Sequence, residues 1–245
     1  GVTFTLTDCD SSGKITHTDS GTGRGVYVYG GGTFNMYGGA ISGNTYEYKS
    51  SFYSASGGGV FVDGDKDGPN GTFHMYGGTI SDNNVIGNYG AGGGGVSVED
   101  YASFSLHDGT ITGNTVTSPA YYNYGGGVEI NKHAYFAMES GTISGNTVTA
   151  SNSANGGGIF ADDGSVLDLS GGTITGNTAD SGAGMQYYRS TVNLSGDITI
   201  TGNATSAGIA SNVFVRSGMP LTVAGELQNT IGVKTERTPT ADRSV

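Results

Sequence analysis

Residues 141–147 read Gly-Thr-Ile-Ser-Gly-Asn-Thr, and close variants of this block recur along the chain. Each variant carries an isoleucine between two small residues, with an asparagine three positions later. The isoleucines are Ile41, Ile80, Ile111, Ile143, Ile174 and Ile200. Since successive side chains of a strand point to opposite faces, the block predicts a very short strand with one buried position, ended by a glycine bend. Its repetition indicates a solenoid-type architecture.

Two other apolar pieces recur in fixed order with this block. One is Gly-Val-x-Val or a close variant, at 25–28, 59–62, 95–98, 127–130 and 158–161. The other alternates two apolar residues, as in Phe73/Met75 and Phe104/Leu106. Three short strands per repeat, with no helical pattern between them, predict an all-β, right-handed parallel β-helix of about seven rungs. We expect a single domain over 1–232, followed by an exit segment and linker over 233–245.

The asparagine of each repeat is expected to be structural. The positions are Asn44, Asn83, Asn114, Asn146, Asn177 and Asn203, and their spacings of 39, 31, 32, 31 and 26 place the surplus residues in one recurring loop. Stacked asparagines can bond to one another, which satisfies amides that would each cost about 1–3 kcal/mol if buried without partners. Phe4, Phe34, Phe73, Phe104 and Phe136 are expected to form an internal aromatic column.

Composition narrows the classes of function. The net charge of −11 disfavours nucleic acid as a partner, because phosphates would be repelled. A single cysteine, Cys9, allows neither an internal disulfide nor a zinc cluster. No apolar run is long enough to span a membrane, and no signal peptide or wall-sorting signal is visible. The chain starts in mid-pattern, so we expect a domain of a longer, secreted or cell-surface protein.

The Gly-Gly-Gly-Val and Gly-Thr-Ile-Ser-Gly-Asn-Thr blocks resemble the pectin-lyase-like β-helix repeats of bacterial surface adhesins. They are similar to repeats of polymorphic outer-membrane proteins and of wall-attached adhesins of Gram-positive bacteria. The resemblance covers roughly residues 1–232 and implies the fold, but not one activity, because the superfamily includes lyases, hydrolases, tailspikes and adhesins. It implies an extracellular location and a host or microbial glycan or surface protein as partner.

The loops after the asparagines carry the main candidate for a binding surface. Rigid, amphipathic tyrosine rings suit sugar stacking or protein recognition, and loops on a rigid scaffold commonly carry binding sites. The alternative is that these rings pack on one another and cover the loop backbones. The candidate ligand-binding residues are Tyr46, Tyr48, Phe52, Tyr53, Tyr89, Tyr121, Tyr122 and Tyr124.

One segment has the spacing of a calcium loop. Asp63, Asp65 and Asp67 alternate and a glycine follows, as in the first half of an EF-hand loop, although His74 stands where the closing glutamate would be. We weigh a weak Ca²⁺ site, the one cofactor considered, against an exposed acidic turn without an ion.

An enzymatic function is the contrasting hypothesis. A polysaccharide lyase or hydrolase needs paired carboxylates or a basic residue on an outer sheet face. The expected outward positions of the Gly-Val-x-Val strands are Tyr27, Phe61, Ser97, Glu129, Phe160 and Gln186. Glu129 and Asp168 are isolated in this pattern, so no catalytic residue is assigned, and a non-binding structural stalk is the third hypothesis. Outward Thr/Ser pairs beside each isoleucine resemble ice-binding faces but are equally typical of solvated strands.

Overall fold

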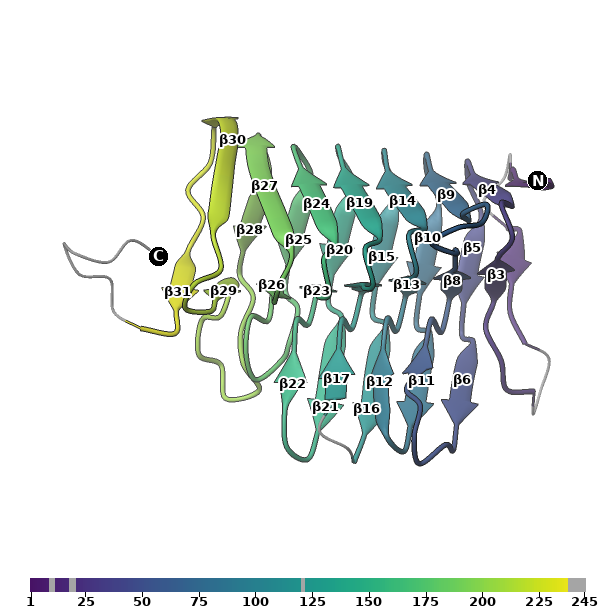
Figure 1. Cartoon of the computed structure of the whole chain (residues 1–245), viewed down its shortest axis with the longest axis horizontal. Coiled ribbons are helices and arrows are strands. Elements are labelled where there is room, and N and C mark those ends of the chain that lie inside the picture. Colours follow the sequence, from purple (N-terminus) through teal and green to yellow (C-terminus); the bar gives the residue numbers. More distant parts are fainter. Residues whose placement is uncertain (9–11, 18–20, 120–121, 238–245) are drawn as a thin grey trace.

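The computed structural model describes residues 1–8, 12–17, 21–119 and 122–237. Every element in this part of the chain is a strand, and nearly all pair in parallel with the equivalent strand of the next repeat. The predicted parallel β-helix is therefore confirmed, and Figure 1 shows its rungs stacked side by side from the N-terminal to the C-terminal end. Among the described residues, no helix has the length and apolarity needed to cross a membrane.

Three long sheets form the main coil. Sheet A contains β1 (Thr3–Leu6), β4 (Thr33–Met36), β9 (Thr72–Met75), β14 (Ser103–Leu106), β19 (Tyr135–Met138), β24 (Val166–Leu169), β27 (Thr191–Gly196) and β30 (Leu221–Leu227). Sheet B contains β2 (Lys14–Ile15), β5 (Ala40–Ser42), β10 (Thr79–Ser81), β15 (Thr110–Thr112), β20 (Thr142–Ser144), β25 (Thr173–Thr175) and β28 (Thr199–Thr201). Sheet C contains β3 (Val26–Val28), β8 (Val60–Val62), β13 (Val96–Val98), β18 (Val128–Ile130), β23 (Ile159–Ala161), β26 (Met185–Tyr187), β29 (Val213–Val215) and β31 (Val233–Thr235). The expected exit segment thus begins with a strand that pairs with β29.

The interior of the main coil consists of columns of like residues. Register between neighbouring strands places phenylalanine over phenylalanine and isoleucine over isoleucine. Rings of the phenylalanine column stack with centroids 4.6 Å apart for Phe73 and Phe104 and 4.9 Å apart for Phe34 and Phe73. The six isoleucines of the repeated block are fully buried in sheet B, whereas Ile15 of β2, at the end of the sheet, is partly buried. The columns predicted from the repeats are therefore present, except that Phe4, at the N-terminal end, stacks on Phe34 but is 50% exposed rather than internal.

The asparagine ladder follows the predicted stack. In each interior step, Nδ2 of one asparagine donates to Oδ1 of the next, at 2.9 Å for Asn83 and Asn114. The same Nδ2 also donates to an isoleucine carbonyl of the preceding rung, and the Oδ1 accepts a backbone N–H, so the amides are well satisfied. Asn203 continues the ladder by donating to Asn212, a residue that the repeat pattern did not indicate.

The segments after the asparagines form two further sheets rather than loops. Sheet D contains β6 (Thr45–Tyr48), β11 (Asn84–Gly87), β16 (Thr115–Ser118) and β21 (Thr147–Ala150). Sheet E contains β7 (Ala55–Ser56), β12 (Gly90–Gly92), β17 (Tyr122–Tyr124) and β22 (Ala154–Asn155). These two sheets, called the second layer below, extend downward from the main coil in Figure 1. A small core of valine and alanine side chains lies in this layer, separate from the main core.

Candidate functional site

Most of the predicted aromatic residues lie in the turns between sheets D and E or in the strands beside these turns. Phe52 is 79% exposed and Tyr53 is 68% exposed, and both lie in the turn between β6 and β7. Tyr89 lies in the turn between β11 and β12, Tyr122 is the first residue of β17 on the next rung, and their rings lie 5.5 Å apart, tilted by 34°. With Tyr48, which is also exposed, these residues form what we call the aromatic edge. Tyr121 lies outside the described residues.

Two of the predicted binding residues pack against the main coil instead. The Tyr124 ring stacks on Phe160 of sheet C at a centroid distance of 4.1 Å. The Arg24 guanidinium lies 3.9 Å from the Tyr46 ring and 4.3 Å from the Phe61 ring. These contacts hold the second layer on sheet C. Both interpretations of the aromatic segments therefore describe part of the structure, self-packing for Tyr46 and Tyr124 and exposure for the aromatic edge.

The acidic turn after β8 binds its own backbone. Asp63 Oδ1 accepts from the Gly64 N–H at 3.0 Å, Asp65 Oδ1 accepts from the Asp67 N–H at 3.1 Å, and Tyr27 OH donates to Asp63 Oδ2 at 3.1 Å. Partial burial raises the pKa of the Asp63 carboxyl. Within the described residues, no group of three histidine, cysteine, aspartate or glutamate side chains could hold a metal ion. The geometry is that of a hydrogen-bonded acidic turn.

Most of the outward face of sheet C is covered. Phe61, Ser97, Glu129 and Phe160 are buried beneath sheet E and the glycines beside its strands, and Gln186 is buried against Gly182, whereas Tyr27 is 53% exposed. The outward side of a strand faces solvent only where nothing packs on it, and here the second layer does. The five buried side chains point outward from the main coil as expected, but they do not face solvent.

A carboxylate pair lies beneath this cover, although the sequence pattern indicated isolated acids without basic neighbours. Glu99 is 8% exposed and Glu129 is 4% exposed, and Ser97 Oγ lies 3.4 Å from Glu99 Oε1 and 3.2 Å from Glu129 Oε2. Lys132 Nζ donates to Glu99 Oε2 at 2.7 Å and to Asp100 Oδ2 at 3.0 Å. These five residues come from β13, β18 and the turns that follow them, so stacking of rungs brings them together.

Burial, followed by the charge of Glu99, raises the pKa of the Glu129 carboxyl to about 8. Burial would lower the pKa of the Lys132 ammonium. The charge of Glu99, together with the hydrogen bonds that Lys132 donates to Glu99 and Asp100, raises this pKa above its ordinary value. Burial and the charge of Glu129 raise the pKa of Tyr124 to about 12. The Glu129 carboxyl has a raised pKa of the kind found in general acids. Because Glu129 is enclosed, however, a polymer substrate could not reach this carboxyl.

The second candidate carboxylate, Asp168, is occupied by neighbours on sheet A. Tyr135 OH donates to Asp168 Oδ2 at 2.8 Å, and Asn193 Nδ2 donates to Asp168 Oδ1 at 2.8 Å. Burial and this hydrogen bond raise the pKa of Tyr135 to about 12. The arrangement stabilises the outer face of three adjacent strands.

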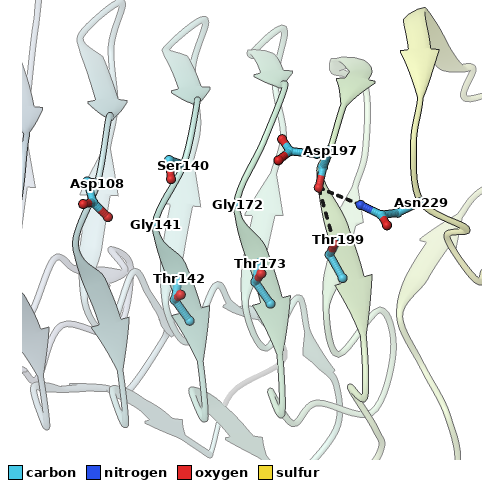
Figure 2. A pocket seen from close by; sticks show the side chains of 9 residues that line it. All are labelled: Asp108, Ser140, Gly141, Thr142, Gly172, Thr173, Asp197, Thr199 and Asn229. Atoms are coloured by element: carbon cyan, nitrogen blue, oxygen red, sulfur yellow. Dashed lines mark hydrogen bonds between the residues drawn. The ribbon is translucent and has the colours of Figure 1, made fainter.

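A shallow polar groove lies at the bend between sheets A and B (Figure 2). Its volume is about 400 Å³, and Gly141 and Gly172 are among the residues that line it. Asn229 Nδ2 donates to the Asp197 carbonyl at 2.8 Å, and Thr199 Oγ1 lies 3.3 Å from the same oxygen. The groove is lined by Asp108, Ser140, Gly141, Thr142, Gly172, Thr173, Asp197, Thr199 and Asn229, so part of the predicted hydroxyl column borders it.

A ladder of rings runs along the same bend on earlier rungs. Tyr37 stacks on Tyr76 at 4.7 Å with a 9° interplanar angle, and Tyr76 stacks on His107 at 4.5 Å and 4°. His107 Nδ1 lies 2.9 Å from Glu139 Oε2. Burial, followed by the charge of His107, lowers the pKa of the adjacent His74. Because the rings are nearly parallel, the faces that they turn toward one another are covered.

The second layer and the buried carboxylates were missed by sequence reasoning, although one signal was present. Valine recurs two positions after the ladder asparagine, at Val85, Val116 and Val148, and these side chains form part of the small core. Comparisons of the chain with protein-family models, with curated proteins and with solved structures found no match.

Proposed function

We propose that this chain is a non-enzymatic, adhesin-type binding domain of an extracellular or cell-surface protein, and that it binds a glycan through the aromatic edge. The observation that carries the proposal is the exposure of large rings in or beside the turns between sheets D and E on three successive rungs, Phe52, Tyr53, Tyr89 and Tyr122 among them. Rings exposed together on a rigid scaffold mark interaction sites more often than single exposed side chains do.

The geometry of the rings favours a glycan ligand. Aromatic faces carry partial negative charge, so the polarised C–H groups of a sugar can pack on them. Phe52 and Tyr53 leave most of their surface free, and the tilt between Tyr89 and Tyr122 leaves these two rings unstacked. The Tyr37–Tyr76–His107 ladder, in contrast, covers its faces by parallel stacking. A chain with a net charge of −11 favours a neutral or amine-bearing glycan over an acidic one.

Binding fits the structure better than catalysis does. Glu129 is enclosed beneath sheet E, and both oxygens of Asp168 accept hydrogen bonds from side chains. Neither carboxyl is free to act on a polymer that approaches from solvent.

A glycan array with the wild-type chain and the double variant Tyr89→Ala/Tyr122→Ala tests this proposal. We expect retention of a neutral glycan by the wild type and at least about tenfold weaker binding by the variant, since stacking on a ring contributes on the order of 1 kcal/mol or more. Tyr37→Ala, an exposed tyrosine on the bend ladder, is the matched control and should bind normally. Binding only to protein, release of sugar fragments, or no binding at all would contradict the proposal, and would favour protein recognition, an enzyme or a stalk, respectively.

A further inference from the structure

The buried carboxylates beneath the second layer have too few hydrogen-bond donors around them for both to be ionised. Ser97 lies between Glu99 and Glu129 but has one hydroxyl hydrogen, which it can donate to only one of them. Glu99 is the member whose charge is compensated, because Lys132 Nζ donates to it at 2.7 Å. A neutral Glu129 completes the network, since its own O–H can donate to Ser97 Oγ while Ser97 donates to Glu99.

Sheet E covers this network closely. A Cβ added at Gly92 of β12 would overlap the Glu129 carboxyl group, so the strand lies directly against it. On the next rung Tyr124 of β17 covers Phe160, the neighbour of Glu129 on sheet C. An ionised carboxylate in this position would lack water and would face a backbone without a countercharge, which is costly in a buried environment.

The surroundings of Glu129 are mainly acidic. Glu99, Asp162 and Tyr124 face it from the turns after β13 and β23 and from β17, and Lys132 faces it from the turn after β18. Lys132 is shared between Glu99 and Asp100. A negative charge on Glu129, added to the charge of Glu99, would therefore not be matched by a second cation within hydrogen-bond distance. The cation near Asp162, Arg189, forms ion pairs with Asp162 and Asp163 and is not available to Glu129.

We propose that Glu129, with Ser97 and Glu99, acts as a proton-operated latch: protonated Glu129 holds the second layer on sheet C, and loss of its proton loosens β12 and β17. The latch is independent of the ligand proposed for the aromatic edge, because it concerns only the attachment of the second layer.

The sign of the pH dependence follows from linkage. The folded chain keeps a proton on Glu129 up to about pH 8, whereas an exposed glutamate loses it near 4.5. Between these values the folded state binds more protons than the unfolded state, so stability falls as the pH rises. The loss is complete above the folded-state value and absent below the unfolded-state value.

Hydrogen–deuterium exchange between about pH 6 and about pH 9, corrected for the intrinsic pH dependence of exchange, tests the latch. We expect protection of peptides containing β12 and β17 to fall at least about tenfold across this range, while β14 and β19 of the main coil change little. Glu129→Gln, a neutral and nearly isosteric variant, should remain protected at all pH values. Asp168→Asn, the matched control on sheet A, should behave as the wild type does.

A ¹³C NMR titration of the glutamate carboxyls provides a second measurement that does not depend on folding of the variant. One carboxyl should titrate near 8, and this signal should be absent from Glu129→Gln. The proposal is wrong if every glutamate in the folded wild type titrates below about pH 6, or if protection of β12 and β17 is independent of pH. It is also wrong if folded Glu129→Gln shows the wild-type fall in protection.

Discussion

On each central rung, the main coil and the second layer bury side chains in different ways. In the main coil, one position carries the same kind of residue on successive rungs, and the asparagine ladder satisfies its own polar atoms. Beneath sheet E, the covered positions change from Phe61 to Ser97 to Glu129 along sheet C, and the contacts change with them. Like residues in register give a rigid and uniform column, whereas unlike residues give a cover whose stability depends on local chemistry.

The comparison predicts a large loss of stability when the phenylalanine column is interrupted. Phe104 is fully buried between Phe73 and Phe136, so Phe104→Ala leaves a cavity and removes two ring stacks. We expect a loss of about 3–5 kcal/mol in the free energy of unfolding, measured by urea denaturation. Phe52→Ala, at the aromatic edge, should change stability by less than about 0.5 kcal/mol. Similar effects of the two substitutions would contradict the account of the core.

Removal of one asparagine from the ladder should have the next largest effect. In Asn114→Ala, the backbone N–H and Nδ2 of Asn83 lose their acceptor, and the Ile80 carbonyl loses a donor. Groups buried without partners cost about 1–3 kcal/mol each, so we expect a loss of roughly 2–4 kcal/mol after relaxation. Thermal denaturation of this variant and of the exposed control Asn152→Ala measures it. A variant as stable as the control would mean that the ladder bonds contribute nothing net.

A smaller, local effect is expected in the second layer. Gly92→Ala introduces a methyl group where the Glu129 carboxyl lies, and overpacking of this kind costs about 1–3 kcal/mol. Chymotrypsin should therefore cut after Tyr89 several times faster, with no change in the urea midpoint of the main coil. Gly225→Ala is the control, because the nearest atom to the added group is the Ser195 Cβ at 3.3 Å and the strand is exposed. Equal cleavage rates in the two variants would show that sheet E does not rest on Glu129.

The smallest expected effect is spectroscopic. Burial is the first cause that raises the pKa values of four tyrosines to about 12, Tyr27, Tyr124, Tyr135 and Tyr187. Their neutral forms favour the folded state, so stability falls as the pH rises from about 10 toward about 12. The chain has no tryptophan, so near-ultraviolet absorbance follows phenol ionisation directly. Tyr135→Phe should reduce by one the number of phenols that titrate at about 12. An unchanged number would contradict the hydrogen bond from Tyr135 to Asp168.

The main coil could be predicted from sequence because its physical requirements repeat. A buried isoleucine, a bend glycine and a ladder asparagine recur in each repeat, so periodicity alone indicates the strands and their register. Asn212 was missed because it lies outside the repeated block, although it accepts from Asn203 at the end of the ladder. The Asp63–Asp67 segment has a spacing that suits either a weak calcium loop or an acidic turn, and in the structure the Asp63 and Asp65 carboxylates accept backbone N–H groups.

The second layer was less predictable because it depends on contacts between different repeats. Alternation shows which side chains leave the main coil at Ser97 and Glu129, but not whether something covers them. The only repeated apolar residue that indicates sheet D is the valine at Val85, Val116 and Val148. Sheet E is built from short strands of unlike sequence, such as Gly-Ala-Gly and Tyr-Asn-Tyr, which give no repeated pattern. The pairing of Glu99 with Glu129 arises from stacking of neighbouring rungs.

The most direct test of the contrast between the two regions is native-state hydrogen exchange at low denaturant, comparing β16 in sheet D with β14 in sheet A. We predict that amides of β16 exchange through an opening that costs less free energy and exposes less surface than global unfolding, because only a small valine and alanine core supports them. Amides of β14 should exchange only through global unfolding. Exchange of both strands through one common unfolding event would contradict the account.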